Sequence, residues 1–158
     1  MRTLPVLGLF AFSSGANAET LAPHTADASV TILRAASAAQ AQPLDFGRVL
    51  PSATGGDFTV FPDGRIDCTG GMVCDARARP AEFRVAGSGE QVAITLSDSA
   101  LLAGPGGESI RLVPLIAAPT LALQGGEAAL MVGGRIAIGP SQAPGRYAGQ
   151  YEIDIQYQ

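Results

Sequence analysis

The residues that could carry out chemistry are few in this chain of 158 residues. The only histidine is His24, and the only cysteines are Cys68 and Cys74. A Ser–His or Cys–His nucleophile needs a histidine held beside it by the fold, whereas His24 is better explained as a solvated residue close to the mature N-terminus. We therefore predict that the protein is not an enzyme.

The two cysteines are predicted to form a disulfide. Five residues separate Cys68 from Cys74, and this spacing fits neither a CxxC redox pair nor a zinc knuckle. In the chain-entropy model, a bond that closes so short a loop stabilises the fold by roughly 2 kcal/mol. We interpret the pair as a structural disulfide of an exported protein.

Composition argues against other kinds of site. All ten basic residues are arginine, so the chain has no P-loop lysine, and the glycine-rich residues 104–109 are predicted to form a turn. Residues 63–67 contain two aspartates but lack the spacing of an EF-hand loop, which leaves only a loose calcium site open. A net charge of −4 makes nucleic acid or an anionic membrane a poor partner. We expect no cofactor, no metal centre and no nucleic-acid partner.

The N-terminal residues predict export. Arg2 is followed by an apolar run over residues 4–12, and residues 16–18 read Ala-Asn-Ala, which is typical of a signal-peptide cleavage site. The run is about half of the roughly 20 residues that span a bilayer, although an uncleaved anchor is the alternative. We predict a signal peptide over residues 1–18 and no transmembrane segment after its removal. The mature protein is expected in the periplasm, at the cell surface or outside the cell.

The elements around these residues are predicted to be β-strands. The last nine residues, 150–158, alternate polar and apolar without interruption, as a half-buried strand does. Their apolar face consists of Tyr151, Ile153, Ile155 and Tyr157. Residues 25–32 repeat this alternation, with Ala26, Ala28, Val30 and Ile32 on one face.

Glycine-rich turns divide the rest of the chain into short segments, several of which also alternate. Gly133 and Gly134 are predicted to be the two-residue connection of a hairpin. Residues 34–42 are rich in alanine and glutamine, which predicts either a short helix or an irregular connector. Seven to ten short strands at this spacing predict an all-β, antiparallel β-sandwich over residues 36–158, after an N-terminal segment over residues 19–35.

Four segments resemble successive motifs of one bacterial family. They are Leu-Asp-Phe-Gly at 44–47, Pro-Ala-Glu-Phe-Arg-Val-Ala-Gly at 80–87, Ala-Leu-Met-Val-Gly-Gly at 129–134 and Pro-Gly-Arg-Tyr-Ala-Gly-Gln-Tyr at 144–151. In this order, from about residue 28 to residue 157, they resemble the family called domain of unknown function 4402. The resemblance implies a secreted, immunoglobulin-like and pilin-like sandwich, with no agreed biochemical function.

The C-terminus also resembles that of chaperone–usher pilus subunits. Such subunits end in an alternating strand with a penultimate tyrosine and a glycine fourteen places from the end, which here are Tyr157 and Gly145. The resemblance implies a sandwich that lacks one strand and is completed by a strand from a partner. That partner would first be a periplasmic chaperone. At an outer-membrane usher, residues 25–32 of the next subunit would then replace the chaperone in a fibre. The tight disulfide loop and the short segment before Thr25 depart from the pilin pattern.

Two functions follow as expectations. In the first, the protein is an exported structural or assembly protein, a fimbrial-type subunit of the kind used in cell adhesion, which polymerises by β-strand complementation. In the alternative, residues 25–32 pair within their own sheet, and the protein is a self-complete, soluble sandwich that binds an unknown ligand. Sugar-binding surfaces commonly use flat aromatic side chains, and the chain has no tryptophan.

Overall fold

The computed structural model describes residues 29–32, 34–88 and 91–158, and it shows an all-β protein. These residues contain no α-helix, and every strand pairing is antiparallel, which confirms the predicted fold class. No helix in this part of the chain is long and apolar enough to cross a membrane. The strands are β1 (Ser37–Gln42), β2 (Val49–Leu50), β3 (Gly56–Val60), β4 (Ile66–Cys68), β5 (Val73–Cys74), β6 (Ala81–Ala86), β7 (Gln91–Leu96), β8 (Ala100–Ala103), β9 (Ser109–Ile116), β10 (Thr120–Ala122), β11 (Glu127–Ile138) and β12 (Ile153–Tyr157).

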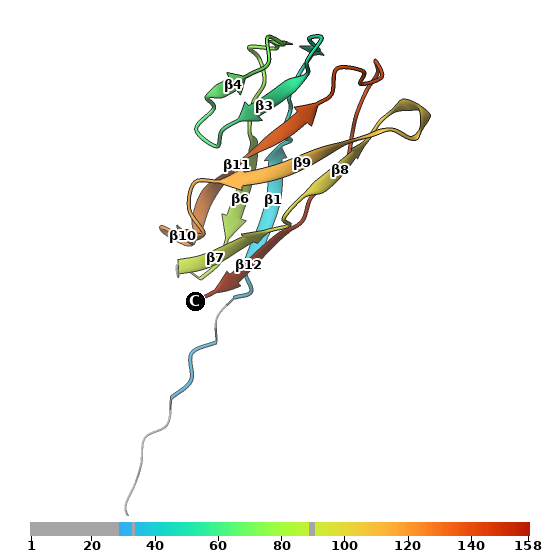
Figure 1. Ribbon diagram of the computed structural model, residues 1–158. Helices are drawn as coiled ribbons and strands as arrows, with labels where there is room; N and C mark the ends of the chain where they lie inside the picture. The colour runs from blue at the N-terminus through green and yellow to red at the C-terminus, as the bar shows by residue number, and fades with distance from the viewer. Residues whose placement is uncertain (1–28, 33, 89–90) are drawn as a thin grey trace, which may run out of the picture. The chain divides into compact units, whose positions relative to one another are not determined.

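The strands form one large sheet and two small ones. The large sheet has the order β1-β6-β11-β3-β4, with β9 on the other edge of β11 and β8 beside β9 (Figure 1). The long strand β11 organises it, because residues 127–132 pair with β6 and residues 134–138 pair with β3. A second sheet has the order β10-β7-β12, and β2 pairs with β5. The number of strands exceeds the predicted seven to ten because several contain only two or three residues.

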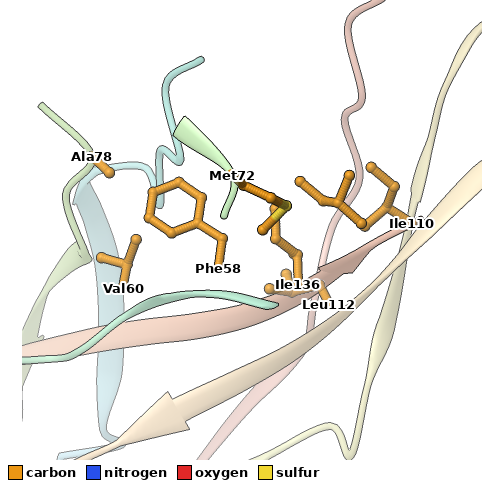
Figure 2. Packing of buried hydrophobic residues seen from close by; sticks show 8 residues of the cluster. Phe58, Val60, Met72, Ala78, Ile110, Leu112 and Ile136 are labelled. Atoms are coloured by element: carbon orange, nitrogen blue, oxygen red, sulfur yellow. The ribbon is translucent and has the colours of Figure 1, made fainter. Parts of the chain in front are cut away.

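Two hydrophobic clusters fill the interior. The first joins β3, β9 and the second half of β11, and Figure 2 shows Phe58, Met72 and Ile136 among its side chains. The second cluster joins β6 and the first half of β11 to the three-stranded sheet. Its buried members are Ala81, Val85, Val92, Ile94, Leu123, Leu130 and Val132. The candidate site described below borders this second cluster.

The predicted hairpin at Gly133 and Gly134 is wrong. Both residues lie inside β11, which continues without a turn from Glu127 to Ile138. Neither has a positive φ angle. They are glycines because neighbouring atoms approach closely, and a Cβ at Gly133 would clash with the carbonyl oxygen of Val60. The glycine pair therefore serves strand packing rather than a turn.

The predicted helix or irregular connector over residues 34–42 is also wrong in its main part. Residues Ser37–Gln42 form β1, which pairs with β6 from Ala86 to Glu82. Helix propensity differs among ordinary residues by at most about 0.7 kcal/mol per residue, and so short a helix is unstable alone. Pairing with β6 satisfies the backbone hydrogen-bonding groups instead, and this tertiary interaction decides the conformation.

The two predicted terminal strands differ from the structure in extent. The C-terminal strand begins at Ile153 rather than at residue 150, because β7 ends at Leu96. Just before it, Ala148 forms a bridge with Ala103 of β8, so the chain passes from the large sheet to the three-stranded sheet. Of the predicted N-terminal strand, residues 25–28 lie outside the described residues, and residues 29–32 have no regular secondary structure.

Candidate assembly edge

Strand β12 places a row of apolar side chains against the second cluster. Its Ile153, Ile155 and Tyr157 lie opposite Leu96, Ile94 and Val92 of β7. Val92 and Ile94 are 0% and 4% exposed, whereas the three β12 side chains are only half-buried. The core is thus complete beneath β7 and incomplete at β12.

The outer edge of β12 is unpaired within the described part of the chain, where its one partner is β7. Strand β1 is likewise an edge strand and pairs with β6 alone in these residues. Every β1 residue is exposed except Gln42, which is half-buried. The two strands meet at one end (Figure 1). There the Tyr157 hydroxyl donates a hydrogen bond of 2.6 Å to the carbonyl oxygen of Arg34.

The exposure of β1 extends to its core side. Residues paired across an antiparallel ladder lie on the same face, so Ala38 shares a face with Val85, and Gln40 shares it with Phe83. Val85 is fully buried in the second cluster, yet Ala38 and Gln40 are exposed. Nothing in the described residues covers this face of β1. We call this uncovered face, together with the free edge of β12, the open edge.

A hydrogen-bond network closes one end of the open edge. The Tyr157 hydroxyl accepts a bond of 2.9 Å from the backbone N–H of Ser88 while donating to Arg34. The Arg34 N–H in turn donates to the Ser88 hydroxyl over 2.7 Å. A Cβ at Gly87 would clash with the Tyr157 hydroxyl, so the residue next to Ser88 must be small. We call Arg34, Ser88 and Tyr157 the clamp.

Sequence reasoning identified Tyr157 but missed the other two residues of the clamp. Arg34 and Tyr157 are 123 positions apart, and Arg34 and Ser88 are 54 apart. The available signal was the sequence Gly-Ser-Gly at residues 87–89, which by itself indicates only one more glycine-rich turn. No local pattern connects such distant positions.

Tyr151 borders the open edge with an unusual hydroxyl group. Its ring packs edge-on against Phe83, with ring centroids 6.5 Å apart. The hydroxyl oxygen is buried and has no hydrogen-bond partner among the described residues. Because burial disfavours the charged phenolate, the pKa of Tyr151 rises to about 12.

Gly145 lies in the loop that leads into β12. Its φ of +154° suits glycine, and a Cβ there would come within 2.6 Å of Pro105 Cγ. The same loop is braced by Tyr147, whose hydroxyl donates to the carbonyl oxygen of Ala143 over 2.8 Å. The Ala143 N–H donates to the Glu108 carboxylate at 3.1 Å. This bracing fixes the position from which the chain crosses to β12.

The predicted donor residues are placed only in part. Ala26 and Ala28 lie outside the described residues, as does His24. Val30 and Ile32 are 85% and 89% exposed. Their proposed role as a donated strand therefore stays a prediction.

The disulfide between Cys68 and Cys74 is present, as predicted. It joins β4, at the edge of the large sheet, to β5 of the two-stranded sheet. Both cysteines pack against the first cluster, whereas the open edge borders the second. The disulfide therefore stabilises the opposite part of the interior from the one that the open edge leaves incomplete.

The aspartate-containing turn at residues 63–67 holds an ion pair. Asp63 accepts a 2.7 Å bond from Nε of Arg65, and this bond is the largest cause of the lowered pKa of Asp63. The Arg65 guanidinium also stacks 4.5 Å from the centre of the Phe61 ring. No group of three potential metal-ligating side chains occurs in the described ranges. A shallow pocket of about 350 Å³ adjoins the turn and is lined by Phe61, Pro62, Asp63, Arg65, Leu115, Ile116 and Ala117.

Comparison with known proteins adds one match. No curated protein and no solved structure matches the chain. The sequence pattern of the family described as Domain of unknown function (DUF4402) matches residues 36–157, from just before β1 to the last residue of β12. The matched region includes both strands of the open edge. The chain therefore belongs to the DUF4402 family.

Proposed function

We propose that this protein is an exported structural or assembly protein, a fimbrial-type subunit that polymerises by β-strand complementation. The observation that carries the proposal is the open edge, where the core-side face of β1 is exposed and β12 has no second neighbour among the residues that the structure describes. The proposal assigns no catalytic residue. The protein would be located in the periplasm during assembly and at the cell surface or outside the cell afterwards.

In the part of the chain that the structure describes, the open edge lacks the features that normally prevent pairing. Natural proteins protect exposed edge strands with charged side chains, with proline or with a covering segment. Strand β1 contains only serine, alanine and glutamine, and β12 carries a single charged residue, Asp154. An added strand would bond the free backbone groups of β12 and cover Ile153, Ile155 and Tyr157. Such a surface is suited to receive a strand from another chain.

The occupant we propose is residues 25–32 of a second copy of this chain. Four alternating apolar side chains end in the larger Val30 and Ile32, and burying each of those two stabilises a complex by about 1.5–3 kcal/mol. Eight extended residues span roughly 26 Å, which exceeds the roughly 17 Å of the five-residue β12 and lets the donor reach Tyr151. The small Ala38 side chain on the β1 face leaves space for larger donor residues. A periplasmic chaperone would occupy the same edge before usher-directed assembly.

The test compares unboiled and boiled samples of the exported protein on a denaturing gel. The donor variant carries Val30→Asp and Ile32→Asp, and the control carries Thr31→Asp on the opposite face of the same segment. We expect a ladder that collapses on boiling for the unaltered chain and the control, and a monomer for the donor variant. Compact monomers in all three cases would refute polymerisation. That result would favour the alternative, a self-complete binding module, for which the apolar pocket beside Phe61 is the first candidate site.

A further inference from the structure

We propose that the clamp of Arg34, Ser88 and Tyr157 determines which copy of the N-terminal segment fills the open edge. By holding Arg34, it directs residues 25–32 to a second copy of the chain and keeps them from folding back on their own edge. This inference rests on the proposed function and adds a specificity-determining role for Tyr157. Tyr157 acts as a positioning residue, because its hydroxyl contacts the base of the donor segment.

The first step of the argument concerns where the chain enters β1. Ser37 at the start of β1 lies opposite Ala86 at the end of β6. Tyr157 at the end of β12 lies opposite Val92, near the start of β7. Only four residues connect β6 to β7, so these two ends lie at the same end of the domain. The clamp contacts confirm this proximity directly.

The second step concerns direction. A donor segment that precedes Arg34 runs toward the clamp, and β12 also runs toward the clamp. A segment filling its own open edge would therefore lie parallel to β12 and would have to reverse direction before entering β1. A segment from another copy is free to enter antiparallel to β12, which is the more stable pairing per residue.

The third step is that the clamp opposes this reversal. Both backbone groups of Arg34 are bonded, with the N–H donating to Ser88 and the C=O accepting from Tyr157. Residues 34–36 contain no turn, and Ile32 is 89% exposed. With Arg34 held in this way, only residue 33 lies between Ile32 and the held backbone, fewer than the two residues that a tight hairpin turn requires. Release of Arg34 would make the hairpin accessible.

The clamp also has the features of a built contact rather than a chance one. Both the donor and the acceptor capacity of the Tyr157 hydroxyl are used, and both partners are backbone groups. Gly87 provides the space that the hydroxyl occupies. Removing the hydroxyl leaves the rest of the Tyr157 ring in its half-buried position against the second cluster.

The experiment compares Tyr157→Phe with Tyr151→Phe in the full exported chain. Both remove a hydroxyl from the same face of the C-terminal segment, but only the Tyr157 hydroxyl has partners among the described residues. We expect Tyr157→Phe to require about tenfold more protein for the same ladder, as suits the loss of two hydrogen bonds. Tyr151→Phe should leave the ladder unchanged. Ser88→Ala removes the acceptor for the Arg34 N–H and should act in the same direction as Tyr157→Phe. It replaces Tyr157→Phe in the test if Tyr157→Phe folds poorly.

A peptide of residues 25–32 separates this inference from the proposed function. Added to the donor variant Val30→Asp/Ile32→Asp, it should bind equally with and without Tyr157→Phe, because the edge is open in both. The peptide should bind weakly to a Tyr157→Phe protein whose own residues 25–32 are unaltered, because those residues then compete with the peptide for the open edge. A ladder unchanged in both Tyr157→Phe and Ser88→Ala would overturn the clamp inference alone. Failure of the peptide to bind the donor variant would instead overturn the proposed function.

Discussion

Replacing Tyr151 with phenylalanine should remove a specific loss of stability at alkaline pH. The folded protein raises the pKa of Tyr151 to about 12 through burial, whereas a tyrosine in an unfolded chain titrates near 10. Between these values the unfolded chain has released a proton that the folded chain retains. The free energy of unfolding therefore falls as the pH rises from about 10 to about 12.

The size of this effect follows from the shift. Two pKa units correspond to about 2.7 kcal/mol at most. Because Tyr151 is only half-buried, solvent screening reduces this, and we expect about 1–1.5 kcal/mol. At neutral pH, Tyr151→Phe should be as stable as the unaltered chain or slightly more stable, since the buried hydroxyl makes no hydrogen bond within the described residues.

The assay is urea unfolding at pH 8, 10 and 11.5, with both proteins in the monomeric Val30→Asp/Ile32→Asp background. Tyr147 and Tyr157 are present in both proteins, so the difference between the two pH profiles isolates Tyr151. If Tyr151→Phe loses stability above pH 10 as steeply as its parent, the reasoning is refuted. A loss of 2 kcal/mol at pH 8 would show that the hydroxyl has a hydrogen-bond partner after all.

Two further predictions concern the other core cluster and the long strand. Gly133→Ala should destabilise the fold by about 2 kcal/mol or more, because its Cβ would meet the backbone oxygen of Val60, whereas Gly139→Ala, with open space around it, should be nearly neutral in thermal unfolding. Replacing both Cys68 and Cys74 with alanine should lower the free energy of unfolding in urea by about 2 kcal/mol without changing the gel ladder, since the disulfide packs in the first cluster. Equal effects of the two glycine changes, or loss of the ladder without the disulfide, would contradict these expectations.

Strand alternation was the most informative pattern in the sequence. It predicted an all-β fold and the apolar face of residues 150–158, because a period of two follows from the geometry of a strand wherever it pairs. It could not give the starting residue of β12, since that depends on where β7 ends. The cysteine spacing likewise predicted a bond that needs only local closure.

The glycine pair and β1 show where local patterns mislead. A Gly-Gly dipeptide suits a turn and a close approach of strands equally well, and only the carbonyl of Val60, far away in the sequence, distinguishes the two at Gly133. Residues 37–42 have the composition of a helix, yet pairing with β6 outweighs small differences in intrinsic propensity. Both errors arise because the deciding partner lies in another part of the chain.

The sequence by itself determined the strand class, the disulfide partners and the apolar face of the C-terminal strand, since each depends on residues close together in the chain. Only the tertiary structure showed that, within the described residues, β1 and β12 are edge strands that border the second cluster. Only the tertiary structure also placed Tyr157 against Arg34 and Ser88. Exposure and hydrogen bonding across such separations depend on how the sheets pack, because a side chain is buried or bonded only by what the whole fold brings to it.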